Sequence, residues 1–112
     1  MENFVQLKFN GRGIIAINKN SIDAIELSRS KIKKISYKFI CMFYGKVYLE
    51  LLPMFVVDKE FMENPQKEEM KEKDKEIEKI FKELLSEKKE IKISKNIGFF
   101  QIGKRDEKSL LI

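Results

Sequence analysis

The side chains of this chain are poorly suited to nucleophilic catalysis. It contains no histidine and a single cysteine, Cys41. The absence of histidine excludes Ser-His and Cys-His nucleophiles and nearly all zinc-site architectures, and one cysteine cannot form an intramolecular disulfide. Cys41 falls in the middle of an alternating apolar row, so we expect a small buried core residue rather than a nucleophile.

Carboxylates are the remaining candidates for acid–base catalysis. Several lie near apolar segments, but such catalysis needs two carboxylates in one pocket, and the sequence shows neither a pair nor a pocket. No dense run of oxygen ligands predicts a calcium site. We therefore expect a protein that is not an enzyme and that holds no metal and no cofactor. The carboxylates considered are Asp23, Glu26, Glu50 and Asp58.

The positive side chains offer a binding surface instead. The net charge is +5, and residues 28–34 form the most basic segment of the chain. This segment is either a basic loop that contacts a partner or a solvated connection between strands. The residues we expect to bind a partner are Arg29, Lys31, Lys33, Lys34, Lys38, Met42, Tyr44, Lys46 and Tyr48.

The stretch 34–52 would position most of these residues, because apolar side chains alternate with period two on both sides of Gly45. Gly45 can adopt the positive φ of a tight reversal, so the stretch predicts a β-hairpin. Its second face becomes apolar from Ile40 to Tyr44, and is there either covered by the chain or exposed to a partner. The predicted buried row is Ile35, Tyr37, Phe39, Cys41 and Phe43, resumed by Val47, Leu49 and Leu51.

Further strands are predicted from local patterns. An Asn10-Gly11 turn separates alternating segments at 4–9 and 14–18. Pro53 should end the second strand of the central hairpin, since proline lacks the N–H of a central ladder. Near the C-terminus, alternation over 90–94 and 97–102 predicts two strands that pair with each other.

One helix is predicted over residues 66–88. Asn64 is a good N-cap and Pro65 a good first residue. The apolar stripe is sparse before residue 77, so we expect residues 66–76 to project into solvent or to dock a partner. The stripe consists of Met70, Ile77, Ile80, Phe81, Leu84 and Leu85.

These elements predict one small α+β domain over residues 1–112, with an antiparallel β-sheet of about five to six strands packed by one long amphipathic helix. The tail 104–112 either frays or docks on the hairpin. No apolar run approaches the roughly 20 residues of a membrane span, and residues 1–4 lack the features of a signal peptide. We therefore expect a cytoplasmic protein without a membrane partner.

Binding functions are the ones these features favour. We expect a non-enzymatic protein-binding module that regulates or inhibits a larger complex, whose partner is another protein or a protein–nucleic-acid complex. Its abundance of Lys, Ile, Glu and Asn is typical of AT-rich genomes, and small proteins of phages and mobile elements often have this role.

Two other functions are compatible with the sequence. One is nucleic-acid binding by a lysine-rich sheet face, with Tyr44 and Tyr48 stacking on bases, although the scarcity of arginine argues against specific readout. The other is a structural homo-oligomer, closed by an edge strand or by the apolar end of the tail.

Overall fold

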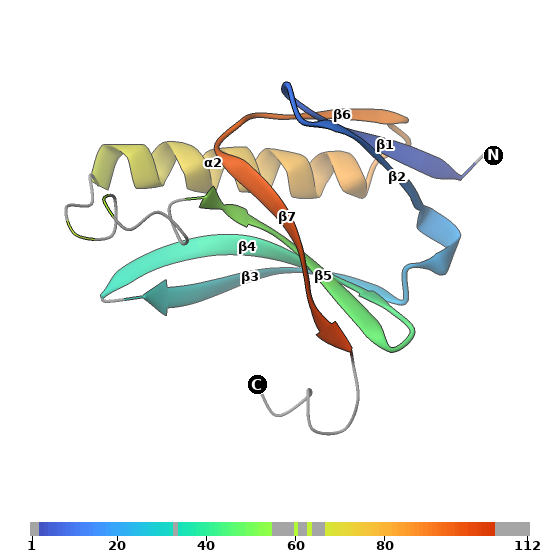
Figure 1. The fold of residues 1–112 in the computed structure, drawn as a ribbon, viewed down its shortest axis with the longest axis horizontal. Helices are drawn as coiled ribbons and strands as arrows, with labels where there is room; N and C mark the ends of the chain where they lie inside the picture. The colour runs from blue at the N-terminus through green and yellow to red at the C-terminus, as the bar shows by residue number, and fades with distance from the viewer. Residues whose placement is uncertain (1–2, 33, 55–59, 61–62, 64–66, 105–112) are drawn as a thin grey trace.

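The computed structural model describes residues 3–32, 34–54, 60, 63 and 67–104, with the backbone alone at 67–69 and 102–104. This part of the chain forms seven strands, a short 3₁₀ turn at Lys19–Ser21 and the helix α2 (Lys67–Leu84). Figure 1 shows α2 lying across the strands. The strands are β1 (Phe4–Phe9), β2 (Gly13–Asn18), β3 (Ala24–Ile32), β4 (Ile35–Tyr44), β5 (Val47–Pro53), β6 (Glu90–Ile93) and β7 (Ile97–Lys104).

The α+β class with one packing helix is confirmed. Among the described residues, the strands are divided between a three-stranded sheet, in the order β2-β1-β6, and a four-stranded sheet, in the order β3-β4-β5-β7. The division arises after α2, where β6 pairs in parallel with β1 while β7 pairs antiparallel with β5. The prediction that these last two strands pair with each other is therefore wrong.

The two predicted hairpin turns are confirmed. Gly11 and Gly45 adopt φ values of +72° and +54°, in the left-handed region that glycine enters at little cost. In the central hairpin Tyr44 lies opposite Val47, so the reversal takes two residues. Because directly opposed residues share a face, the apolar side chains of β5 continue the even-numbered face of β4.

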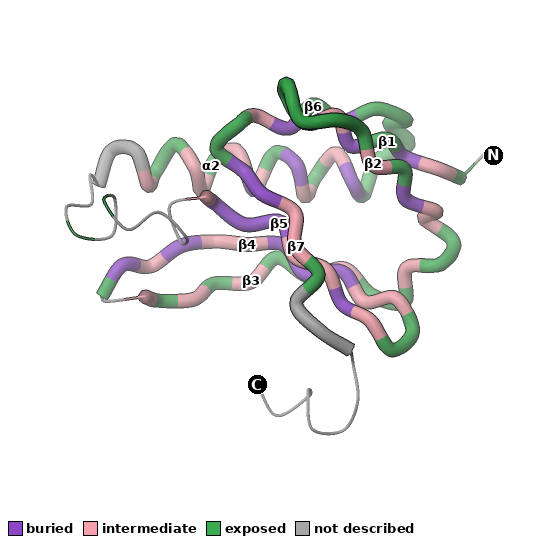
Figure 2. The backbone as a smooth tube through the Cα atoms, viewed as in Figure 1, coloured by how far each residue is buried: buried purple, intermediate pink, exposed green. Residues whose placement is uncertain are grey.

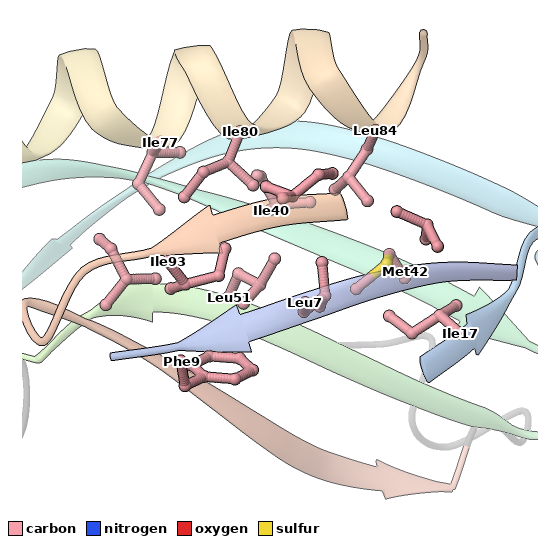
Figure 3. Close-up of a cluster of buried hydrophobic side chains, with 13 residues drawn as sticks. Leu7, Phe9, Ile17, Ile40, Met42, Leu51, Ile77, Ile80, Leu84 and Ile93 are labelled. Carbon is pink, nitrogen blue, oxygen red and sulfur yellow. The ribbon is translucent and has the colours of Figure 1, made fainter. Parts of the chain in front are cut away.

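The main hydrophobic core therefore lies on the face of β4 opposite to the predicted one. Ile40, Met42 and Leu51 have no solvent exposure, and α2 and the three-stranded sheet cover them (Figures 2 and 3). Figure 3 shows Ile77 and Ile80 of α2 pointing toward Ile40. The apolar end of the second hairpin face, from Ile40 to Tyr44, was expected to be either covered by the chain or exposed to a partner. The structure shows that the chain covers it.

The opposite face of β4 carries a smaller cluster. Ile35 and Tyr37 are buried there, and Phe39 and Met70 pack against them while partly exposed. Cys41 is also buried on this face, with 6% exposure, which confirms its expected position. The predicted row is therefore a secondary layer.

The helix stripe is confirmed at Ile77, Ile80 and Leu84, which are buried. Leu85, which was assigned to the same stripe, is 61% exposed because α2 ends at Leu84. The predicted N-cap and first helical residue lie outside the described residues.

The first half of α2 also contacts the sheets. Met70 joins the cluster around Tyr37, and the carboxylate of Glu76 accepts hydrogen bonds from the backbone N–H and the hydroxyl of Ser94 at 3.2 and 2.8 Å. Over its described side chains, this half therefore packs on the strands and does not project into solvent.

Gly98 marks a tightly packed point of β7. A Cβ atom at this position would lie 2.5 Å from the sulfur of Met54 and 2.6 Å from the ring of Phe100. No larger residue fits there without displacing these side chains. Close packing, one of the two explanations suggested by this glycine, is therefore present.

Candidate partner-binding surface

The basic segment is a strand. Residues 28–32 form the second half of β3, which pairs with β4 from Ala24↔Phe43 to Ile32↔Ile35. The expectation of a loop or connection is wrong for these residues because pairing with a long, strongly apolar β4 extends the ladder to its end. Lys34, with φ of +71°, lies in the tight reversal that follows.

Among the described strands, β3 lies at the edge of its sheet and no strand pairs with its outer side (Figure 1). The backbone N–H of Lys38 donates to Oδ1 of Asp74 at 3.0 Å instead of to β3. Arg29 and Lys38, which lie opposite each other, therefore form a non-hydrogen-bonded pair. By alternation, the outward N–H and C=O groups belong to Ile25, Leu27, Arg29 and Lys31, and within the described ranges no strand pairs with them.

Three of the predicted binding residues gather along this edge. Arg29 and Lys31 are exposed on one face of β3, beside Leu27, which is 36% exposed. Arg29 Nη1 donates to the hydroxyl of Ser36 at 3.2 Å, which orients the guanidinium. Lys34 is exposed at the reversal. We call Leu27, Arg29, Lys31 and Lys34 the basic edge.

Lys38 has a structural role on the inner face. Its ammonium forms an ion pair with Glu78 of α2, and the hydrogen bond from Lys38, together with its charge, holds the pKa of Glu78 below its usual range. Lys38 is half-buried. The ion pair links α2 to β4, and the ammonium of Lys38 is already engaged within the protein.

Three further predicted binding residues lie inside the protein. Met42 is fully buried and Tyr48 is 8% exposed, with its ring centroid 5.9 Å from that of Phe43. Tyr44 is half-buried, its hydroxyl donates to the carbonyl oxygen of Asn18 at 3.5 Å, and burial raises its pKa to about 12. Met42 and Tyr48 are therefore not accessible to a partner in this structure.

The remaining two residues do not extend the surface. Lys46 is exposed, but it lies in the β4–β5 turn, at the end of β4 far from Lys34. Lys33 lies outside the described residues. The sequence pattern thus brings together Arg29, Lys31 and Lys34, and it missed Leu27, although the period-two alternation from Ile25 to Lys31 was a usable signal.

The chemistry of the outer sheet face does not favour catalysis. Cys41 lies between Glu26 on β3 and Glu50 on β5. Burial, followed by the charges of Glu50 and Glu26, raises the pKa of its thiol to about 11. The thiol is therefore protonated near neutral pH and is a poor nucleophile. No group of three or more metal-ligating side chains suited to a metal ion occurs in the described part.

A hollow of about 420 Å³ lies beside the ends of β1 and β6. Phe9, Lys92 and Glu76 are among its lining residues. The carboxylate of Glu76 is already engaged by Ser94, so the hollow presents no free acid for catalysis.

The comparisons with known proteins add no assignment. No family model, no curated protein and no solved structure matches this chain. The described residues contain no helix long and apolar enough to cross a membrane.

Proposed function

We propose that this protein is a non-catalytic protein-binding module that regulates or inhibits a larger complex. The observation that carries the proposal is the basic edge, where Arg29, Lys31 and Lys34 are exposed along a strand whose outer side pairs with no described strand. Unpaired backbone groups and clustered cations together suit an acidic protein surface.

The same residues have a simpler role as well. Lysines on an edge strand discourage pairing with other copies of the chain. Residues with this role alone would stay solvated and would bind no partner. Arg29 favours partner binding over this protective role, because its guanidinium is oriented by Ser36 and is suited to bidentate contact with a carboxylate. Leu27 adds an apolar contact beside it.

Nucleic-acid binding is less well supported. Tyr44 and Tyr48 were its stacking residues, but Tyr44 lies opposite Val47 and Tyr48 lies opposite Phe43. They therefore point to opposite faces of the sheet, and neither presents an open ring. What supports this alternative is the positive charge alone, which would give salt-sensitive, nonspecific binding.

Affinity capture from a lysate of the native host tests the proposal. The wild-type chain is compared with the triple variant Arg29→Ala, Lys31→Ala, Lys34→Ala. The matched control, Lys46→Ala, Lys92→Ala, Lys95→Ala, loses the same charge at exposed positions away from the basic edge. We expect a defined protein partner, resistant to nuclease, whose recovery falls by about tenfold or more in the first variant and is retained in the control.

Two results would contradict the proposal. Equal recovery by the two triple variants would remove the basic edge from the interaction. Loss of the captured protein after nuclease treatment would show that nucleic acid is the direct ligand.

A further inference from the structure

We infer that the basic edge binds an extended acidic segment of the partner, which adds to the four-stranded sheet as a new strand beside β3. The inference rests on the proposed function and specifies its ligand. The outward backbone groups of Ile25, Leu27, Arg29 and Lys31 supply the ladder. Each offers one N–H and one C=O that an added strand would satisfy.

The side chains on this edge define the ligand further. Leu27, Arg29 and Lys31 share one face of β3, so an added strand places alternate residues opposite them. All pairings within this sheet are antiparallel, and we assign the same direction to the ligand. Read from its N-terminus, the ligand is then acidic-any-acidic-any-apolar, with the acidic side chains opposite Lys31 and Arg29 and the apolar one opposite Leu27.

Glu26 adds a further restriction. Its side chain is exposed on the other face of β3, where it accepts a hydrogen bond from the hydroxyl of Ser28 at 2.9 Å. The ligand residue opposite Glu26 follows the apolar residue directly. An acidic side chain there would oppose a like charge, so the motif ends at the apolar position.

A second copy of this chain is a poorer occupant. Symmetric antiparallel pairing about Ser28 places Arg29 opposite Leu27 and Lys31 opposite Ile25 of the copy. Arg29 and Lys31 of both copies would then crowd one face, while Glu26 points to the other face and cannot compensate. Charge complementarity therefore favours an acidic ligand.

Fluorescence anisotropy with synthetic peptides tests the inference. The probe is a labelled Thr-Glu-Thr-Glu-Thr-Val-Thr peptide, and the full-length chain is titrated into it. In the proposed ladder, the N–H groups of the two Glu and the Val point toward β3, and those of the threonines between them point away. N-methylation of the first set should weaken binding by about tenfold or more, whereas N-methylation of the second set should leave the affinity within about twofold.

Two variants of the chain complete the test. Leu27→Pro removes an outward N–H without removing a β3–β4 hydrogen bond, and should weaken binding by about tenfold. Lys92→Ala, at an exposed position on the other sheet, should bind like the wild type. If Leu27→Pro fails to fold, as judged by circular dichroism, the pair of N-methylated peptides still decides the question.

The outcomes separate the inference from the proposed function. Equal weakening by the two N-methylated peptides, or none by either, would overturn strand addition while leaving an acidic partner in place. Failure of the acidic peptide to bind, together with capture of a protein partner that depends on the basic edge, would overturn the ligand assignment alone. Preferential binding of a single-stranded oligonucleotide, or a concentration-dependent dimer that masks β3, would overturn the inference in favour of that occupant.

Discussion

Glu50 shows how the environment of one residue is decided by strand register. It lies on β5 opposite Cys41 on one side and Phe100 on the other, and burial raises its pKa above the usual range. Burial destabilises the ionised form of the side chain, since a half-buried carboxylate has lost part of its hydration. No ion pair offsets this loss of hydration among the described residues, so we expect the ionised Glu50 to lower the stability of the fold.

Replacing Glu50 by glutamine should therefore stabilise the protein at about pH 7. Because the folded-state pKa is raised, the wild type is most stable below the unfolded pKa and loses stability as the pH rises through the folded value. The advantage of Glu50→Gln should shrink as the pH falls through the raised folded value and should be lost below about 4. Thermal unfolding at several pH values measures this, with Glu72→Gln at an exposed position as the control. A lower melting temperature for Glu50→Gln at neutral pH would contradict the assignment.

The relation between α2 and β4 is the feature that organises the fold at the level of elements. β5 pairs with β4 only from Ile40 onward, so no strand of the described part pairs with the first half of β4 on that side. α2 occupies the position, with Asp74 accepting the N–H of Lys38 and Glu78 pairing with its ammonium. The helix thus covers this side of β4, whereas no described element pairs with the outer side of β3.

Asp74→Ala should destabilise the protein by about 1–3 kcal/mol, because the N–H of Lys38 is left without an acceptor in a partly buried place. Asp74→Asn keeps an acceptor oxygen and should lose less. Urea unfolding measures the stability, and hydrogen exchange at the Lys38 amide reports the local effect. Wild-type stability and exchange in Asp74→Ala would show that this contact has no protective role.

At the scale of the whole molecule, two sheets share one helix and one core. α2 contacts β4 and β5 of the four-stranded sheet and β6 of the three-stranded sheet, and the buried cluster draws on all of these elements (Figure 3). Arg12 adds a polar link, since its guanidinium donates to the carbonyl oxygens of Ser94 and Ile97 at 3.0 and 2.7 Å. The β1–β2 turn is thereby tied to the point where β6 and β7 diverge.

Two neighbouring residues of β4 locate the core. Ile40→Ala should destabilise the protein by about 2–5 kcal/mol, because it opens a cavity in a fully buried site. Phe39→Ala should cost less, although the side chain is larger, since Phe39 lies half-buried on the other face. Chemical denaturation of the two variants compares them. A greater loss of unfolding free energy for Phe39→Ala would indicate that the main core lies on the face of β4 predicted from the sequence.

Local chain chemistry accounts for what the sequence determined by itself. Period-two and helical spacing, the glycines at the turns, and Pro53 at the end of β5 depend on a few neighbouring residues. They predicted the described strands other than β3, the two hairpin turns and most of the apolar stripe of α2. The grouping of Arg29, Lys31 and Lys34 was predictable for the same reason. The absence of histidine by itself also excluded histidine-activated nucleophiles and nearly all zinc-site architectures.

Tertiary structure decided the rest, because these features depend on pairings between distant segments. A two-residue reversal after Tyr44 exchanged the inner and outer faces of β5 relative to β4, and a change of one residue in that turn would have reversed the result. The described strands form two sheets because β6 pairs with β1 while β7 pairs with β5. Pairing with β4 made the basic segment an edge strand, and the place of a strand in the sheet depends on its distant partners.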